Sequence, residues 1–157
     1  MSNALVLDKA RNLATAAACV AELVAATEAT PSDRITVLGG GQIELLIAFL
    51  RHGFDDVACL SSTRNGSGVG EADIVIAPAI DNETELAALL CSLGRALRPG
   101  GNLVVRLTET AALRNQQQLL PIFLKSGFAA VERRASSGNL GSLWLARKQS
   151  KISARAA

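Results

Sequence analysis

The stretch "VLGGGQIELL", Val37 to Leu46, joins a short apolar run to an apolar helix through three glycines. The run from Ile35 to Leu38 is typical of a buried parallel strand. Apolar residues spaced three and four apart from Ile43 to Leu50 predict a helix that closes at Gly53, a residue suited to the left-handed position after a helix. A strand, a glycine turn and a helix in this order begin a strand–helix crossover. The stretch therefore predicts an α/β domain, and its glycines are either a binding loop or only a tight turn.

The alternation of strands and helices continues along the rest of the chain. Further strands are predicted at Val57–Leu60, Asp73–Ala77, Asn102–Leu107, Phe128–Arg134 and Ser142–Arg147. Further helices are predicted at roughly Asp8–Glu28, after Asn82 with a stripe of Leu86, Leu90, Leu93 and Leu97, and at Ala111–Ser126. The last of these helices contains Pro121, which should kink or split it, and Gly127 ends it.

Short signals mark the boundaries of these elements. Asn82 followed by Glu85 resembles a capping box. "RPGG", from Arg98 to Gly101, is expected to end the preceding helix as a turn, and "ASSGNLG" is expected to connect an antiparallel pair.

The predicted fold class is α/β, a three-layer, Rossmann-like, mainly parallel sheet of about six strands with a C-terminal antiparallel hairpin. Asp73–Ala77 and Asn102–Leu107 are expected to be central. We expect an N-terminal helix in residues 1–34 packed on the domain, the domain itself in residues 35–148, and a disordered tail in residues 149–157.

Composition excludes several classes of protein. The chain has 157 residues, 49% of them hydrophobic and 19% charged, which suits one domain with a sizeable core. A net charge of +2 and 3% aromatic residues argue against nucleic-acid binding and against an anionic membrane surface. Charges interrupt the alanine-rich N-terminal segment, so it predicts neither a signal peptide nor a membrane span.

Cys19, Cys59 and Cys91 are widely spaced among apolar neighbours and predict buried, free thiols in a reducing compartment. A cytoplasmic protein is the corresponding expectation. His52 is the single histidine, in the last turn of a predicted helix, where it is expected to complement the helix dipole. With no clustered ligands beside it, we predict no metal site and name no catalytic residue.

The chain from about Ile35 to Lys148 resembles the class I methyltransferases that use S-adenosylmethionine. "VLGGGQIELL" is similar to their glycine-rich first motif, and "EADIVIAP" to their fourth strand. "LGRALRPGGNLVVRL" is similar to their helix, Pro-Gly-Gly turn and fifth strand. "LLPIFLKSGFAAVERR" with "GSLWLARK" is similar to their closing helix and hairpin.

The resemblance implies a cofactor site that this sequence only partly retains. Its cofactor-binding residues would be Gly39, Gly40, Gly41, Ser61 and Pro78. Ser61 stands where the family has a carboxylate for the ribose hydroxyls, and a serine cannot clamp a diol with two oxygens. Ile43 or a later residue falls on the family's last glycine. The segment Ser61–Ala72 is too short for a helix and a third strand, which would need roughly 25 residues because a crossover alone takes ~10–12.

Two functions of different classes follow from this partial match. The first is a non-catalytic interaction or regulatory module that has lost efficient S-adenosylmethionine binding. The second is a minimal methyltransferase whose pocket is completed by a partner or by a second copy. Loss of the third strand would make Val57–Leu60 an edge strand without charge or proline, so we expect a homo-oligomer or a protein partner there.

Overall fold

The computed structural model describes residues 2–39, 43–60, 71–93, 96–108, 116–135 and 142–149. The helices within these ranges are α1 (Ser2–Thr27), α2 (Ile43–Arg51), α3 (Glu83–Ser92) and α5 (Gln116–Lys125). The strands are β1 (Ile35–Leu38), β2 (Val57–Leu60), β3 (Ala72–Ile80), β4 (Leu97–Leu107), β5 (Phe128–Ala135) and β6 (Ser142–Lys148).

The six strands form one sheet in the order β2-β1-β3-β4-β6-β5. β2, β1, β3 and β4 are parallel, whereas β6 pairs antiparallel with both β4 and β5. The predicted fold class is confirmed, including the six strands, the central position of β3 and β4, and the C-terminal hairpin. The prediction that Val57–Leu60 is an edge strand is confirmed for the part of the chain that the structure describes.

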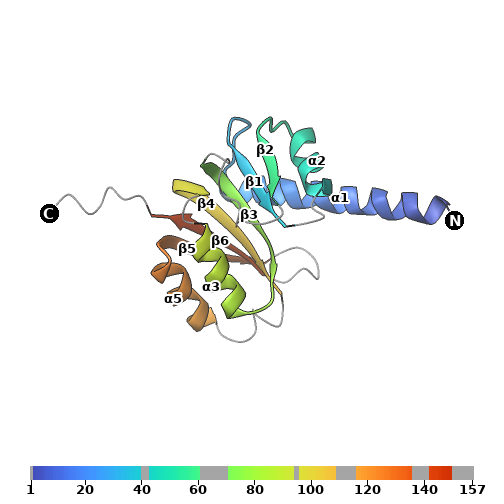
Figure 1. Ribbon diagram of the computed structural model, residues 1–157. Coiled ribbons are helices and arrows are strands. Elements are labelled where there is room, and N and C mark those ends of the chain that lie inside the picture. The colour runs from blue at the N-terminus through green and yellow to red at the C-terminus, as the bar shows by residue number, and fades with distance from the viewer. Residues whose placement is uncertain are drawn as a thin grey trace.

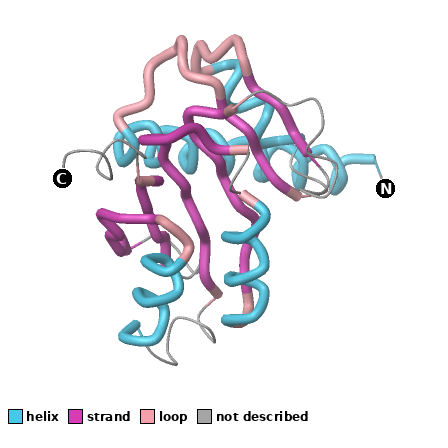
Figure 2. Tube along the Cα trace, turned by 60° about the vertical axis from the view of Figure 1, so that its left-hand side comes forward, coloured by secondary structure: helices cyan, strands magenta, loops and turns pink. Residues whose placement is uncertain are grey.

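Helices cover both faces of the sheet and make three layers (Figure 1). α3 and α5 pack on one face, where Leu86, Leu90 and Phe123 meet the inner side chains of β3 and β4. α1 and α2 pack on the other face, where Val20 and Phe49 are buried against β1, β3 and β4. The strands between the two helical layers can be followed in Figure 2. Two apolar clusters, one on each side of the sheet, therefore form the core.

α1 is longer than the sheet that it covers, and its N-terminal part extends past the strands (Figure 1). Its Val6 and Leu7 are 65% and 67% exposed, whereas Val20 and Leu23 are buried. The sequence predicted a start near Asp8, but the helix already includes Ser2. None of the helices in the described ranges is long and apolar enough to cross a membrane.

The "RPGG" segment corrects a prediction. It does not end a helix, because α3 ends at Ser92 and β4 begins at Leu97. Leu97 pairs with Ala72 of β3, and the register then shifts before Asn102 meets Ile74. A local bulge absorbs the extra residues, with Gly100 at a φ of +80°. Leu97 was assigned to a helical stripe but is a buried strand residue.

Two prolines sit inside regular elements. Pro78 lies in β3, which runs on to Ile80 beyond the predicted end at Ala77, and a register shift between Ile76 and Ala79 accommodates it. Pro121 lies within α5, which continues from Gln116 to Lys125 without the predicted split. The predicted start of this helix at Ala111, the connector from 136 to 141 and the tail after Gln149 lie outside the described residues.

The helix boundaries agree with the capping signals. Asn82 has extended backbone, and its side-chain oxygen accepts a hydrogen bond of 2.8 Å from the N–H of Glu85. The carboxylate of Glu85 accepts a hydrogen bond from the N–H of Asp81, one residue before the N-cap. Gly53 and Gly127 have φ values of +103° and +86° and follow α2 and α5, as predicted.

The cysteine prediction was right about pairing and wrong about burial. None of the three forms a disulfide, but Cys59 and Cys91 are exposed and Cys19 is half-buried. Cys59 is on a four-residue edge strand, and Cys91 is on the outer side of α3, so neither can be covered by the layers. The protein around Cys59 still removes water from one side and raises the pKa of its thiol by desolvation.

Candidate functional site

The carboxyl ends of β1 and β3 bring together two of the predicted cofactor-binding residues. Val37 of β1 pairs with Ile76 of β3. Gly39 comes two residues after Val37, and Pro78 comes two residues after Ile76, so both lie at the same end of the sheet. Ligands of open parallel sheets bind outside the carboxyl ends of the strands. Gly40, Gly41 and Ser61 lie outside the described residues, and the side chain of Pro78 does as well.

Gly39 is the described part of the glycine turn. Its φ of +111° is a conformation that an L side chain rarely adopts, so the turn requires glycine at this position. Its N–H donates to the carbonyl oxygen of Leu60 over 2.8 Å, which ties the end of β1 to the end of β2. That N–H is therefore used within the fold.

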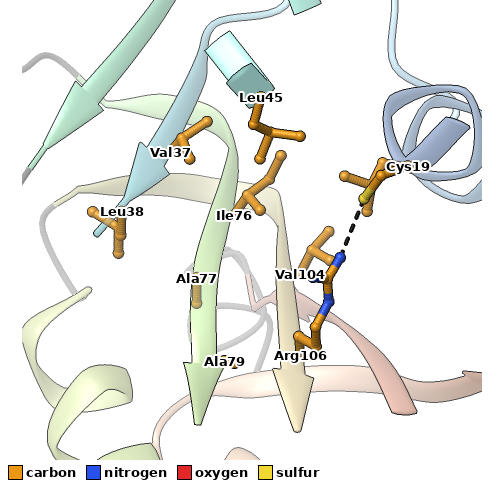
Figure 3. Close-up of a pocket in the computed structure, with 10 residues that line it drawn as sticks. Cys19, Val37, Leu38, Leu45, Ile76, Ala77, Ala79, Val104 and Arg106 are labelled. Carbon is orange, nitrogen blue, oxygen red and sulfur yellow. Dashed lines mark hydrogen bonds between the residues drawn. The ribbon is translucent and has the colours of Figure 1, made fainter. Parts of the chain in front are cut away.

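A small cavity of about 40 Å³ lies beside this turn, between α1 and the carboxyl halves of β1, β3 and β4 (Figure 3). Apolar side chains and two polar groups line it: Leu23, Val37, Leu38, Leu45, Ile76, Ala77, Ala79 and Val104, with Cys19 and Arg106. A water molecule needs at least ~10–15 Å³ of such space, so the cavity has room for a group of only a few heavy atoms.

Arg106 and Cys19 meet across this cavity. Strand alternation puts Val104 and Arg106 of β4 on the face that α1 covers. The guanidinium Nη2 of Arg106 donates to Sγ of Cys19 over 3.2 Å (Figure 3). No ion pair found among the described residues includes Arg106.

Neither Arg106 nor Cys19 is among the site residues that the sequence predicts. One signal was available, since Arg106 interrupts the apolar run of a predicted central strand, where a charge is costly to bury. Its contact with Cys19 spans 87 residues of sequence and could not be read from spacing.

The amino end of the sheet holds a second polar cluster with a structural role. Asp73 accepts a hydrogen bond of 2.7 Å from the backbone N–H of Arg34 and forms an ion pair with Arg98. Arg34 also pairs with Asp56 over 2.8 Å, which raises the pKa of the guanidinium. These contacts connect the amino ends of β1, β3 and β4 and stabilise the end of the sheet opposite the cavity.

Other chemistries find no support in the described part of the chain. His52 follows α2 directly and stacks on Phe54 at a centroid distance of 6.1 Å, exposed and away from the cavity. No group of three or more potential metal ligands is found among the residues that the structure describes.

Solved structures share this fold at low sequence identity. Streptomyces venezuelae DesVI matches with a TM-score of 0.62 and 13% identity, covering 95% of this chain and 97% of that one. A Burkholderia thailandensis 1,6-didemethyltoxoflavin-N1-methyltransferase with bound S-adenosylhomocysteine matches with a TM-score of 0.58 and 13% identity, covering 88% of this chain and 79% of that one. An O-methyltransferase family protein from Burkholderia thailandensis matches with a TM-score of 0.55 and 17% identity, covering 90% of this chain.

The chain is shorter than some of these structures. It spans 59% of the O-methyltransferase family protein and 65% of a matching protein from Bordetella parapertussis. No protein-family model matches the sequence, and no curated protein does either. The strand order, the helical layers and these structures together show that the chain has a Rossmann-like fold of the class I methyltransferase type.

Proposed function

We propose that this chain is a methyltransferase-type domain that works as a non-catalytic interaction or regulatory module and has lost efficient S-adenosylmethionine binding. The observation that carries the proposal is the position of β2 at the edge of the described sheet. Only residues 61–71 separate the end of β2 from the start of β3. A helix, a further strand and their connections need roughly 25 residues, so this segment has no length for the wall on which the family's adenine rests.

The second support is the chemistry available for the ribose. The resemblance implies a carboxylate at the tip of the second strand, and the residue that follows β2 in the sequence is Ser61. Charged hydrogen bonds contribute ~1.5–3 kcal/mol each, so losing two or three would move a micromolar site to the millimolar range. Binding by the isolated chain is therefore expected to be weak.

A second candidate function is a minimal S-adenosylmethionine-dependent methyltransferase completed by a partner or by a second copy. The glycine turn favours it, because Gly39 keeps the positive φ that lets a backbone approach a ligand closely. Methyl transfer depends chiefly on positioning, so the lack of an evident base does not exclude it.

Calorimetric titration of the chain with S-adenosylmethionine and with S-adenosylhomocysteine tests the proposal. We expect no saturation below the millimolar range with either ligand. A dissociation constant in the low micromolar range would overturn the proposal and favour the second candidate. The variant Gly39→Val should then abolish binding, whereas Gly53→Ala, another glycine with positive φ, should not.

For the interaction itself, we propose that another protein chain, a second copy or a different protein, docks along the β2 edge. Val57, Ala58 and Leu60 are partly exposed there, and the strand carries neither charge nor proline. Such an edge favours pairing with another strand.

A further inference from the structure

Arg106 is a cation on a central strand of the sheet. It is half-buried on the face covered by α1, and its hydrogen-bond acceptor in the described structure is the thiol of Cys19. A thiol sulfur is a weak acceptor, and a guanidinium has five N–H donors. The one described contact thus leaves most of the hydrogen-bonding capacity of Arg106 for another acceptor.

The cavity beside Arg106 limits what that acceptor can be. Its walls are apolar side chains from β1, β3 and α2, including Val37, Ile76 and Leu45. Its volume of about 40 Å³ holds a few heavy atoms. An ion of higher charge would need several more donors than one guanidinium, whereas two carboxylate oxygens match the planar fork of an arginine.

We propose that this cavity binds a small carboxylate, with its oxygens on the guanidinium of Arg106 and its short hydrocarbon part against the apolar wall. The site uses α1, α2, β1, β3 and β4, and none of its lining residues belongs to the segment that follows β2. It therefore goes beyond the proposed loss of S-adenosylmethionine binding and can be present whichever way that proposal is decided.

NMR titration with propionate, and with propionamide as its neutral counterpart, tests the proposal on the whole chain. We expect saturable shifts with propionate in the amides of residues that line the cavity, and at least about tenfold weaker binding of propionamide, since the charged contact is lost. Equal binding of the two compounds, or no saturable response to propionate, would overturn the proposal.

Two variants locate the cation. Arg106→Met keeps an unbranched apolar stem and removes the guanidinium with its charge, so propionate binding should fall at least about tenfold. Arg147→Met is the matched control, because Arg147 is exposed on the same face of the sheet, opposite Asn102. It removes one positive charge from that face and should leave binding unchanged. Equal losses in both variants would mean general charge attraction and would contradict a site at Arg106.

Thiol alkylation gives a second readout that needs no variant. The Cys19 thiolate displaces iodide from iodoacetate or iodoacetamide, forming a carbon–sulfur bond, and the thiol proton goes to solvent. Iodoacetate carries a small carboxylate that could bind Arg106, whereas iodoacetamide is neutral. At each cysteine, the alkylation rate with iodoacetate is divided by the alkylation rate with iodoacetamide. This ratio should be several-fold higher at Cys19 than at the exposed Cys59 and Cys91. Comparing ratios cancels differences in thiol pKa. A ratio at Cys19 no higher than at the other two would count against the proposal.

Discussion

Replacing Gly101 by alanine is expected to destabilise the protein more than replacing its neighbour Gly100, although both belong to the same Pro-Gly-Gly segment. A Cβ at Gly101 would lie 2.6 Å from Cδ1 of Leu97 and 2.9 Å from the carbonyl oxygens of Arg98 and Asp73. Real Cβ atoms essentially never approach other atoms this closely. The two oxygens belong to the backbone, and the Asp73–Arg98 ion pair holds that corner together. The strand pair must move apart to admit the methyl group.

The magnitudes follow from two different mechanisms. Overpacking a buried position costs ~1–3 kcal/mol, and backbone contacts place Gly101→Ala toward the upper value. At Gly100 there is open space within 4 Å, but a φ of +80° strains an L residue. That strain costs ~1–2 kcal/mol and is partly offset by ~0.4–1 kcal/mol from the lower entropy of the unfolded chain. We expect a loss of about 1 kcal/mol for Gly100→Ala and about 2–3 kcal/mol for Gly101→Ala.

Urea unfolding followed by circular dichroism measures both values, and thermal unfolding gives a parallel ranking. A domain of this size shifts its Tm by roughly 2–4 °C per kcal/mol, so the two variants should differ by about 5 °C. Gly53→Ala is the matched control, because Gly53 has a φ of +103° and open space, and it should resemble Gly100→Ala. A Gly101→Ala protein as stable as Gly100→Ala would refute the account of this bulge.

Three further perturbations probe other parts of the chain. Asn82→Ala removes the 2.8 Å cap of α3 and should cost about 1 kcal/mol in urea unfolding, while Asn82→Asp should cost much less. Desolvation raises the pKa of Cys59, so at pH 8 iodoacetamide should alkylate it more slowly than it alkylates a cysteine peptide. The folded state holds the thiol proton more tightly than the unfolded state does. The free energy of unfolding, measured relative to Cys59→Ser, should therefore fall as the pH rises above about 8.5. Ala58→Lys places a charge on the β2 edge, so light scattering should show an oligomer for the native sequence and a smaller species for the variant; a native chain that stays monomeric at high concentration would argue against self-association.

The sequence predicted the cores of the inner strands β1, β3 and β4 because they are mostly apolar runs that the helices cover on both faces of the sheet. Ile35–Leu38 and Asn102–Leu107 need no tertiary information to be recognised as such. β4 begins as early as Leu97 because Leu97 pairs with Ala72 of β3. This contact joins segments far apart in sequence, so local sequence patterns do not predict it. The proline and glycines of "RPGG" favour a turn locally, but the segment is part of β4, because a bulge accommodates its extra residues within the strand.

The candidate site was predictable only on its glycine side. A run of glycines after a strand signals a turn with positive φ, and Gly39 has that φ. The cavity and its Arg106–Cys19 contact depend on α1 crossing above β4, which neither local spacing nor composition specifies. The exposure of Cys59 and Cys91 was missed for a related reason, since the apolar neighbours of a cysteine do not show whether a further layer covers it.

The β2 edge of the sheet and its interior strand β4 have different consequences for function. The family resemblance implies ribose and adenine contacts on the β2 side, where only residues 61–71 separate β2 from β3. Arg106 lies on β4, separated from β2 by β1 and β3, and none of the residues that line its cavity belongs to residues 61–71. A domain of this kind can lose a nucleoside ligand and still recognise a small acid beside the same glycine turn. The two ligands should therefore respond separately: Arg106→Met should weaken propionate binding, and its response to S-adenosylhomocysteine should stay as weak as that of the native chain. If the native chain does bind S-adenosylhomocysteine, a variant that lost both responses would mean that a single site serves both ligands.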